Sequence, residues 1–170
     1  MSKYSQYDDS ALIELINLGD TDAFETLYDR YSSKVYKQCY FFCLNVEEAK
    51  DLMHDVWIKV FFSIDTFQQK SSFPTWLHRI TTNHCLNQVK KKTELSINNT
   101  EIPNHNGKEA SAEVKKILSR LSVEDRTLLI MKYADEFTYE EISEKLDIGT
   151  SAVKMRLSRL IKNLKEGFNL

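Results

Sequence analysis

Residues 138–165 constrain the fold of this chain most strongly, because they have the pattern of two short helices joined by a tight turn. Thr138 and Glu141 stand at the spacing of a capping box, and an apolar stripe follows them at helical spacing. This predicts a first helix over about residues 139–146. A second helical pattern begins almost at once, so the segment is predicted to be a helix-turn-helix.

The turn and the start of the second helix carry their own sequence signals. Gly149 is expected to take a positive φ angle, which has no steric cost for glycine, and Asp147 tolerates the same region better than most residues. Thr150 or Ser151 is expected to cap the second helix, because its hydroxyl can accept a backbone N–H.

The second helix is predicted to have one apolar face and one basic face, since no Asp or Glu occurs between Gly149 and Glu166. A helix of this kind fits the major groove of DNA, where its N-terminal side chains meet base edges and the others meet phosphates. The apolar positions are Val153, Leu157, Leu160, Ile161 and Leu164, and the basic positions are Lys154, Arg156, Arg159, Lys162 and Lys165.

The alternative is that the basic face is only solvated and that the motif is a way to pack three helices. Ser122 and Asp125 are expected to cap the third helix of such a module, over residues 123–133. Three caps at suitable intervals favour the DNA-binding interpretation. The expected buried residues of this helix are Leu128, Leu129 and Met131.

Composition limits the rest of the chain. With 170 residues, 42% of them hydrophobic, and only 4 Gly and 2 Pro, the sequence favours an all-α protein of two small helical domains. The formal net charge of −2 indicates that positive charge is confined to particular helices and that a partner supplies much of any grip on DNA. No apolar run reaches membrane-spanning length and no signal-peptide core occurs, so a cytoplasmic protein without membrane insertion is expected.

The cysteines indicate neither disulfides nor a metal site. Their number, 3, is odd, and no C-x-x-C spacing occurs. Cys39 and Cys43 lie one helical turn apart and Cys85 is alone, which favours buried small apolar side chains over zinc ligands. We therefore expect no metal and no cofactor.

Residues 1–92 are predicted to form the first domain. A first helix is expected to be capped by Asp8, Asp9 and Ser10 and ended by Gly19, and residues 20–22 are expected to start a second helix. The third is expected to run from its cap, Asn45, to about residue 62, with an apolar side and an acidic side. Its apolar stripe comprises Ala49, Leu52, Met53, Val56, Trp57, Val60 and Phe61, and its acidic side comprises Glu47, Glu48, Asp51 and Asp55.

The fourth helix, opened by Ser72 and Pro74 and running to about Lys92, has the opposite charge, because no acidic residue occurs between Asp65 and Glu94. Aromatic rings alternate with cations and amides here, a combination that suits unstacked, single-stranded bases, although each ring alone is more simply a core residue. The rings are Phe67, Phe73 and Trp76, and the other polar groups are His78, Asn83, His84, Asn87 and Gln88.

Residues 93–108 lose hydrophobic periodicity and are rich in Asn, Thr, Pro and Gly, so they are predicted to be a flexible linker. Residues 109–170 are predicted to form the second domain. Its first helix is expected to start near Glu109 and to carry Val114, Ile117, Leu118 and Leu121 ahead of the helix-turn-helix.

With these motifs in place, the chain resembles the extracytoplasmic-function (ECF) subfamily of bacterial RNA polymerase sigma factors over nearly its whole length. Four motifs in the family's order carry the resemblance: Gly19-Asp20 with Ala23-Phe24 and Leu27-Tyr28, residues 48–61, Phe67 with residues 71–80, and residues 121–164. The resemblance implies a non-enzymatic factor that binds RNA polymerase core, recognises and helps to melt promoter DNA, and directs transcription initiation. The family's intervening domain is here reduced to the linker.

The resemblance also implies partners and sites. The partners are the polymerase core, through its β′ clamp coiled coil and β flap, promoter DNA, and an anti-sigma factor or other regulatory protein. The chain departs from common family choices at His54, Asp55, Asp147, Met155 and Ser158. The implied core-binding residues are Asp51, His54 and Asp55, the implied minus-ten residues are Phe67, Trp76, Ile80 and Asn83, and the implied minus-thirty-five residues are Lys132, Tyr139, Glu140, Lys154, Met155, Arg156, Ser158 and Arg159.

Two other classes compete with this interpretation. A different helix-turn-helix regulator with an N-terminal sensor domain would share the second domain, but it would not need an acidic helix followed by an aromatic, basic one. A metal phosphohydrolase is indicated by the His54-Asp55 dipeptide with Asp51. One such pair is not a site, because the remaining histidines lie in the basic helix or the linker.

Overall fold

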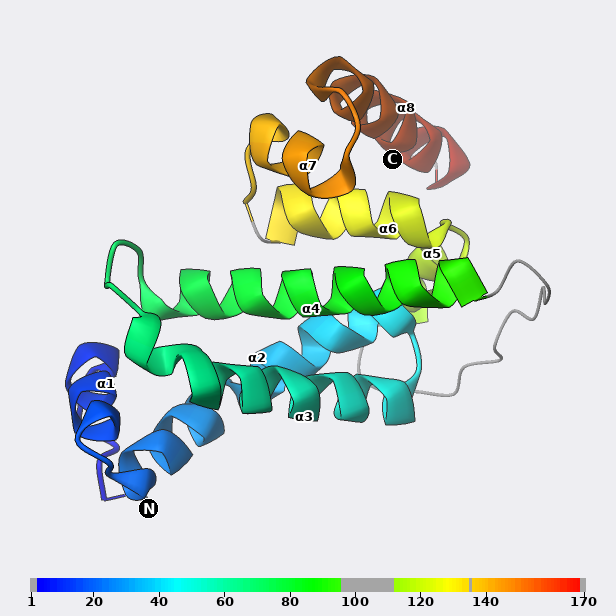
Figure 1. Cartoon of the computed structure of the whole chain (residues 1–170). Helices are drawn as coiled ribbons and strands as arrows, with labels where there is room; N and C mark the ends of the chain where they lie inside the picture. The colour runs from blue at the N-terminus through cyan, green and yellow to red at the C-terminus, as the bar shows by residue number, and fades with distance from the viewer. Residues whose placement is uncertain (1–2, 96–111, 135, 169–170) are drawn as a thin grey trace. The chain divides into compact units, whose positions relative to one another are not determined.

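The structure, a computed structural model, describes residues 3–95, 112–134 and 136–168, and every regular element in those ranges is helical (Figure 1). The chain divides into two compact units, Met1–Asn104 and His105–Leu170. The prediction of an all-α protein with two helical units is confirmed. The linker was predicted to start at residue 93, but the fourth helix continues to Leu95, and residues 96–108 of the predicted linker lie outside the described part.

The first two helices begin at side-chain caps. Of the three caps predicted for the first helix only Asp8 is one, because Asp9 and Ser10 are already helical. Helix α1 (Asp9–Asn17) starts where the Asp8 carboxylate accepts the Ala11 N–H at 2.8 Å, and Gly19 follows its end with φ at 92°. Helix α2 (Thr21–Cys43) starts where Asp20 accepts the Ala23 N–H at 3.1 Å. Each cap satisfies an N–H group that the helix itself leaves without a partner.

The remaining helices of this unit follow after short connections. Helix α3 (Val46–Ser63) is capped by Asn45, and a 3₁₀ turn, η1 (Ile64–Thr66), extends it. Helix α4 (Phe73–Leu95) then runs alongside α3 in Figure 1, with the Ser72 hydroxyl 3.4 Å from the Thr75 N–H. Both predicted caps, Asn45 and Ser72, are therefore present.

Helices α2, α3 and α4 contact one another around the core of the first unit, and α1 packs against α2 and η1. The core confirms most of the predicted stripe of α3, with two differences: Met53 is half-buried, and Phe61 is 52% exposed. Cys39 and Cys85 are buried as predicted, Cys43 is half-buried, and all three are free thiols. The buried residues of α3 are Ala49, Leu52, Val56, Trp57 and Val60.

The second unit contains α5 (Ala112–Ser119), α6 (Val123–Leu129), the π-helical segment η2 (Ile130–Ala134), α7 (Tyr139–Leu146) and α8 (Thr150–Phe168). The predicted helix over residues 123–133 is thus α6 continued by a π-helical turn. The predicted start of α5 near residue 109 lies outside the described part. The core of the second unit includes six apolar side chains that are at most 3% exposed: Leu128, Met131, Phe137, Ile142, Val153 and Leu157.

The helix-turn-helix confirms the predicted first helix and corrects the predicted turn. Thr138 and Glu141 form the full capping box of α7. Asp147 takes the left-handed conformation, with φ at 54°, and Gly149 does not. Helix α8 begins at Thr150, so neither Thr150 nor Ser151 is its cap, and Gly149 holds the preceding position. One residue in the left-handed conformation is enough to end a helix, and Asp147 is the residue that directly follows α7.

The module also corrects two details of α6. The Ser122 hydroxyl caps it by accepting the Asp125 N–H at 3.1 Å, whereas the Asp125 carboxylate pairs with Arg156 instead of capping. Leu129, predicted to be buried, is half-buried, and Ile130 of the π-helical turn is buried in addition to Leu128. The π-helical turn shifts the inward positions by about one residue relative to a regular helix.

His84 is the buried histidine of the first unit. It was predicted to contribute to a nucleic-acid surface, but its side chain is 4% exposed, with Nε2 3.5 Å from the Asp55 Oδ2 atom on α3. Burial, assisted by the positive charge of Lys59, lowers the pKa of His84 below its usual value, although Asp55 opposes this shift. The imidazole is therefore neutral in the folded protein at neutral pH.

We expect Thr138→Ala to destabilise the second unit by about 1 kcal/mol, because the Glu141 N–H loses the Thr138 hydroxyl that accepts it at 3.1 Å. Thr150→Ala serves as the matched control, since Thr150 is the first residue of α8 and not its cap. Hydrogen exchange of the amides in α7 and α8 measures both effects. An equal loss of protection in the two variants would contradict the cap assignment.

We expect the unfolding free energy of the first unit to fall as pH is lowered through about 6.5, because His84 binds a proton in the unfolded chain more readily than in the folded one. His84→Leu should flatten this dependence. Tryptophan fluorescence during urea unfolding reports on this unit alone, since both tryptophans, Trp57 and Trp76, lie in it.

The exposed His54 supplies the control for this experiment. His54→Gln should retain the pH dependence of the wild-type protein. The interpretation is wrong if His84→Leu and the wild type lose the same free energy between about pH 7.5 and 5.5.

Candidate protein and nucleic-acid interfaces

Three of the four predicted acidic residues of α3, Glu47, Asp51 and Asp55, are exposed and Glu48 is half-buried. Two of these four carboxylates form ion pairs with lysines of the first unit. Glu47 accepts from Lys50 at 3.0 Å, Glu48 pairs with Lys92 of α4, and Asp55 lies beside His84. Asp51 is exposed and forms no ion pair with any described residue. Asp51 is therefore the carboxylate of α3 that is most available to a partner from outside.

An apolar groove, the α2/α3 groove, adjoins this acidic side. It is a shallow cavity of about 350 Å³ between α2 and α3. Phe61 is 52% exposed and Phe62 is 77% exposed, which is unusual for rings of this size on a soluble surface. Sequence periodicity placed Phe61 in the core and so missed the groove. Its lining residues are Phe24, Tyr28, His54, Trp57, Ile58, Phe61 and Phe62.

Ring contacts hold the groove in shape. Phe24 of α2 meets Trp57 and Phe61 of α3 edge to face, with ring centroids 5.8 and 5.2 Å apart. The rings of Tyr28 and Trp57 are tilted toward each other, with their centroids 5.0 Å apart. Because His54 lines the groove and Asp51 lies one turn before it, the apolar and acidic surfaces are continuous along α3.

A second surface lies at the start of α4. The rings of Phe67, Phe73 and Trp76 are mutually packed, with centroid separations of 5.9 Å between Phe67 and Phe73, 5.7 Å between Phe73 and Trp76, and 5.2 Å between Phe67 and Trp76. Phe73 is 3% exposed and belongs to the core, whereas Phe67 and Trp76 are half-buried. The structure thus separates one supporting ring from two rings at the surface.

The predicted minus-ten residues of α4 fall on one side of that helix. Trp76, Ile80 and Asn83 are spaced by four and three residues, and all are half-buried. The exposed Asn87 and Lys90 continue the same line, which spans about 21 Å from Trp76. The face combines aromatic, amide and cationic groups in order along the helix, a composition that suits a single nucleic-acid strand.

The third surface belongs to the helix-turn-helix. Two lysines lie over the Tyr139 ring, with the Lys132 Nζ atom 4.4 Å and the Lys154 Nζ atom 5.2 Å from its centroid. Lys132 also donates to the Phe137 carbonyl at 3.1 Å. These contacts join η2, α7 and α8, so two cations are held in place on one side of the module.

The N-terminal half of α8 exposes the other predicted duplex contacts. The Arg156 Nε atom donates to the Asp125 Oδ1 atom at 2.8 Å, which ties the guanidinium to α6. Ser143 closes the turn below, since its hydroxyl donates to the Ile148 carbonyl at 2.6 Å. The exposed predicted residues are Glu140, Lys154, Met155, Arg156, Ser158 and Arg159, while Lys132 and Tyr139 are half-buried.

Residues 3–95, 112–134 and 136–168 contain neither a metal-binding cluster nor a membrane-spanning helix. No group of three or more His, Cys, Asp and Glu side chains in that part of the chain is arranged to hold a metal ion. None of the helices found there combines the length and the apolar character that a membrane span requires.

Comparison with known families matches both units. Residues 27–94 match the family described as Sigma-70 region 2, and residues 111–164 match Sigma-70, region 4. The ECF RNA polymerase sigma factor SigW of Bacillus subtilis (strain 168) is 30% identical over 167 residues, which cover 86% of this chain and 89% of SigW. The ECF RNA polymerase sigma-E factor of Haemophilus influenzae is 26% identical over 174 residues, which cover 91% and 92% of the two chains.

Solved structures are similar in fold. The sigma factor RpoE from Bartonella quintana, in complex with the anti-sigma factor NepR, has a TM-score of 0.62 at 22% identity, over 86% of this chain and 97% of that one. CnrH, in complex with the cytosolic domain of CnrY, has a TM-score of 0.60 at 19% identity, over 95% and 97% of the two chains.

Proposed function

Because the chain belongs to the extracytoplasmic-function RNA polymerase sigma factors, which direct transcription initiation, we propose that its three surfaces divide this task between the polymerase and the promoter. The match of both units to sigma factor regions decides against another helix-turn-helix regulator. The observation that carries the division of labour is that the acidic and apolar surface of α3, the aromatic surface at the start of α4 and the basic surface of α8 lie on separate helices.

We propose three parts with separate roles. Residues 1–92 bind polymerase core and the minus-ten element, residues 93–108 link the domains, and residues 109–170 bind the minus-thirty-five element. The division between Met1–Asn104 and His105–Leu170 supports this arrangement, because each unit has its own buried core.

The polymerase contact is formed by α3. Asp51, His54 and Asp55 face the basic coiled coil of the β′ clamp, and the α2/α3 groove receives apolar side chains from the same coiled coil. The unpaired Asp51 on the same helix as the exposed Phe61 and Phe62 supports this, since a protein interface combines an apolar centre with charges at its rim. The charges steer association, and the groove slows dissociation.

The minus-ten contact is formed at the start of α4. Phe67 and Trp76 stack on an unstacked base of the non-template strand, and Asn83 reads its edge, while Ile80 packs against it. Capture of an extruded base favours the open state, because the strand is bound only when the duplex has separated. The half-buried rings on a buried support, Phe73, suit this task.

The minus-thirty-five contact is formed by the helix-turn-helix, with the N-terminal half of α8 in the major groove. Arginine and lysine bind phosphates or guanine, and the smaller polar and apolar residues set the preferred sequence. The contact residues are Lys132, Tyr139, Glu140, Lys154, Met155, Arg156, Ser158 and Arg159.

The remaining partners follow from this role. The protein acts in the cytoplasm with the polymerase, contacts the β flap as well as the clamp, and carries no catalytic group of its own, because the polymerase performs RNA synthesis. An anti-sigma factor or other regulatory protein controls it. The sigma factor RpoE, which is similar in fold, is bound by the anti-sigma factor NepR.

We expect Asp51→Lys to weaken binding to polymerase core by about tenfold at about 0.1 M salt, with an effect that shrinks as salt is raised. Phe62→Ser should increase the dissociation rate without changing the salt dependence, because Phe62 is 77% exposed and carries no charge. Stopped-flow binding measures the association rate with polymerase core, and competition binding measures the dissociation rate. Glu144→Lys on α7, which changes net charge equally, is the control and should bind core normally.

We expect Asn83→Ala to impair strand opening and Arg156→Ala to impair recognition of the upstream duplex. In vitro transcription with core enzyme and a random promoter library separates the two, because Asn83→Ala should lose activity on duplex promoters and regain it on pre-melted ones. Arg156→Ala should lose selection at minus-thirty-five positions, at a cost of about 1 to 3 kcal/mol at a base it reads. Unchanged output from both variants would refute the assignment.

A further inference from the structure

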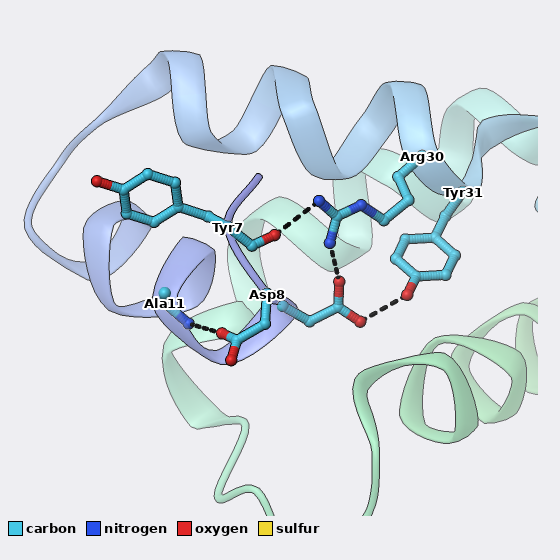
Figure 2. A network of polar contacts seen from close by, with 6 residues as sticks. Tyr7, Asp8, Ala11, Arg30 and Tyr31 are labelled. Atoms are coloured by element: carbon cyan, nitrogen blue, oxygen red, sulfur yellow. Dashed lines mark hydrogen bonds and ion pairs between the residues drawn. The ribbon is translucent and has the colours of Figure 1, made fainter. Parts of the chain in front are cut away.

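The carboxylate of Asp9 joins α1 to α2 through two neighbouring residues of α2. The Arg30 Nη1 atom donates to Oδ1 at 2.6 Å, and the Tyr31 hydroxyl donates to Oδ2 at 2.5 Å. The second Arg30 nitrogen, Nη2, donates to the Tyr7 carbonyl at 2.8 Å, as Figure 2 shows. Charge-assisted bonds of this kind fix the direction of the groups they join.

The network does not end at the hydroxyl of Tyr31. Its side chain is 7% exposed, and its ring lies 5.5 Å from the ring of Phe73, measured between centroids. Phe73 in turn contacts both Phe67 and Trp76. One tyrosine thus has its polar end in the α1 network and its ring against the buried support of the aromatic cluster.

Helix α1 reaches the same region by a second route. It packs against η1, the turn that ends α3 and leads directly into Phe67. The Phe67 N–H donates to the Ile64 carbonyl at 3.1 Å, and Ile64 is 3% exposed. The position of α1 therefore bears on Phe67 through the backbone as well as through Tyr31.

We propose that Asp9, Arg30 and Tyr31 form a positioning network for the minus-ten surface. The network holds Phe73 in place, and Phe73 supports Phe67 and Trp76 in the orientation in which they stack on an unstacked base. Tyr31 is a positioning residue, because it acts through Phe73 and touches no DNA. This inference rests on the proposed function of Phe67 and Trp76.

The chemistry of Tyr31 suits a permanent support. Burial, and then the hydrogen bond to Asp9, raise the pKa of Tyr31 far above its usual range. The phenol therefore stays protonated and keeps donating its hydrogen bond to Asp9 over the whole pH range in which nucleic acids remain paired. Loss of the hydroxyl alone would leave Asp9 paired with Arg30, so no buried charge would be stranded.

The test compares Tyr31→Phe with Tyr40→Phe in the holoenzyme. Tyr40 lies on the same helix, is 2% exposed, and its hydroxyl has no hydrogen-bond partner among the described residues. Both variants remove one buried hydroxyl and keep the ring. Only the Tyr31 variant should slow promoter opening, by about three- to tenfold, the range that one hydrogen bond corresponds to. A 2-aminopurine reporter in the minus-ten element measures the opening rate.

Two further readouts separate positioning from general loss of structure. Affinity for polymerase core should be unchanged in Tyr31→Phe, because the α2/α3 groove does not contain Tyr31. The opening defect should also disappear on a promoter with an abasic nucleotide at the captured position, since no base is then left to stack on Phe67 and Trp76.

The outcomes are distinct. If Trp76→Ala opens promoters normally, the proposed role of the aromatic surface fails, and the inference with it. If Trp76→Ala is slow but Tyr31→Phe matches Tyr40→Phe, the positioning network alone is refuted. A defect of Tyr31→Phe that persists on the abasic promoter also overturns the proposal, because it would then act elsewhere than on base capture.

Discussion

The burial of one stripe on each of α2, α3 and α4 is the constraint on which the rest of the first unit depends. Turning Val56 and Val60 of α3 into the core sets the rotation of that helix about its axis. The acidic residues and Phe62 must then face outward, because positions on a helix have fixed angular separations. The same holds for α4, where the buried Leu77 and Cys85 leave Trp76, Ile80 and Asn83, the proposed minus-ten residues, at the edge of the core.

The formal net charge of −2 does not show how unevenly acidic and basic residues are divided among the helices. Within α3 and α4, Glu48 pairs with Lys92 and Asp55 lies beside His84, so much of the acidic charge serves the packing of these two helices. What remains for a partner is a small number of charges on the same helix as the shallow apolar α2/α3 groove. Such a surface gains affinity mainly from apolar burial and orientation from charge.

In the second unit, contacts within the chain hold three of the long cationic side chains in place. Lys132 and Lys154 share the Tyr139 ring, and Arg156 is tied to Asp125. Side chains that are already ordered lose less conformational entropy when they bind. The module therefore presents part of its basic surface in a prepared form, although each contact alone is weak.

The sequence by itself determined where most helices begin, because a cap involves residues only three positions apart: Asp8, Asp20, Asn45, Ser122 and Thr138 were all predicted and are all present. Local patterns also predicted the acidic surface of α3 and the basic surface of α8. Only the tertiary structure decided that Phe61 is exposed and His84 buried, since the limit of a buried stripe depends on which neighbouring helix covers it. The same holds for the bonds from Arg30 and Tyr31 to Asp9, which join residues 21 and 22 positions apart. No periodicity along one helix records such a contact, because it exists only once two helices have packed.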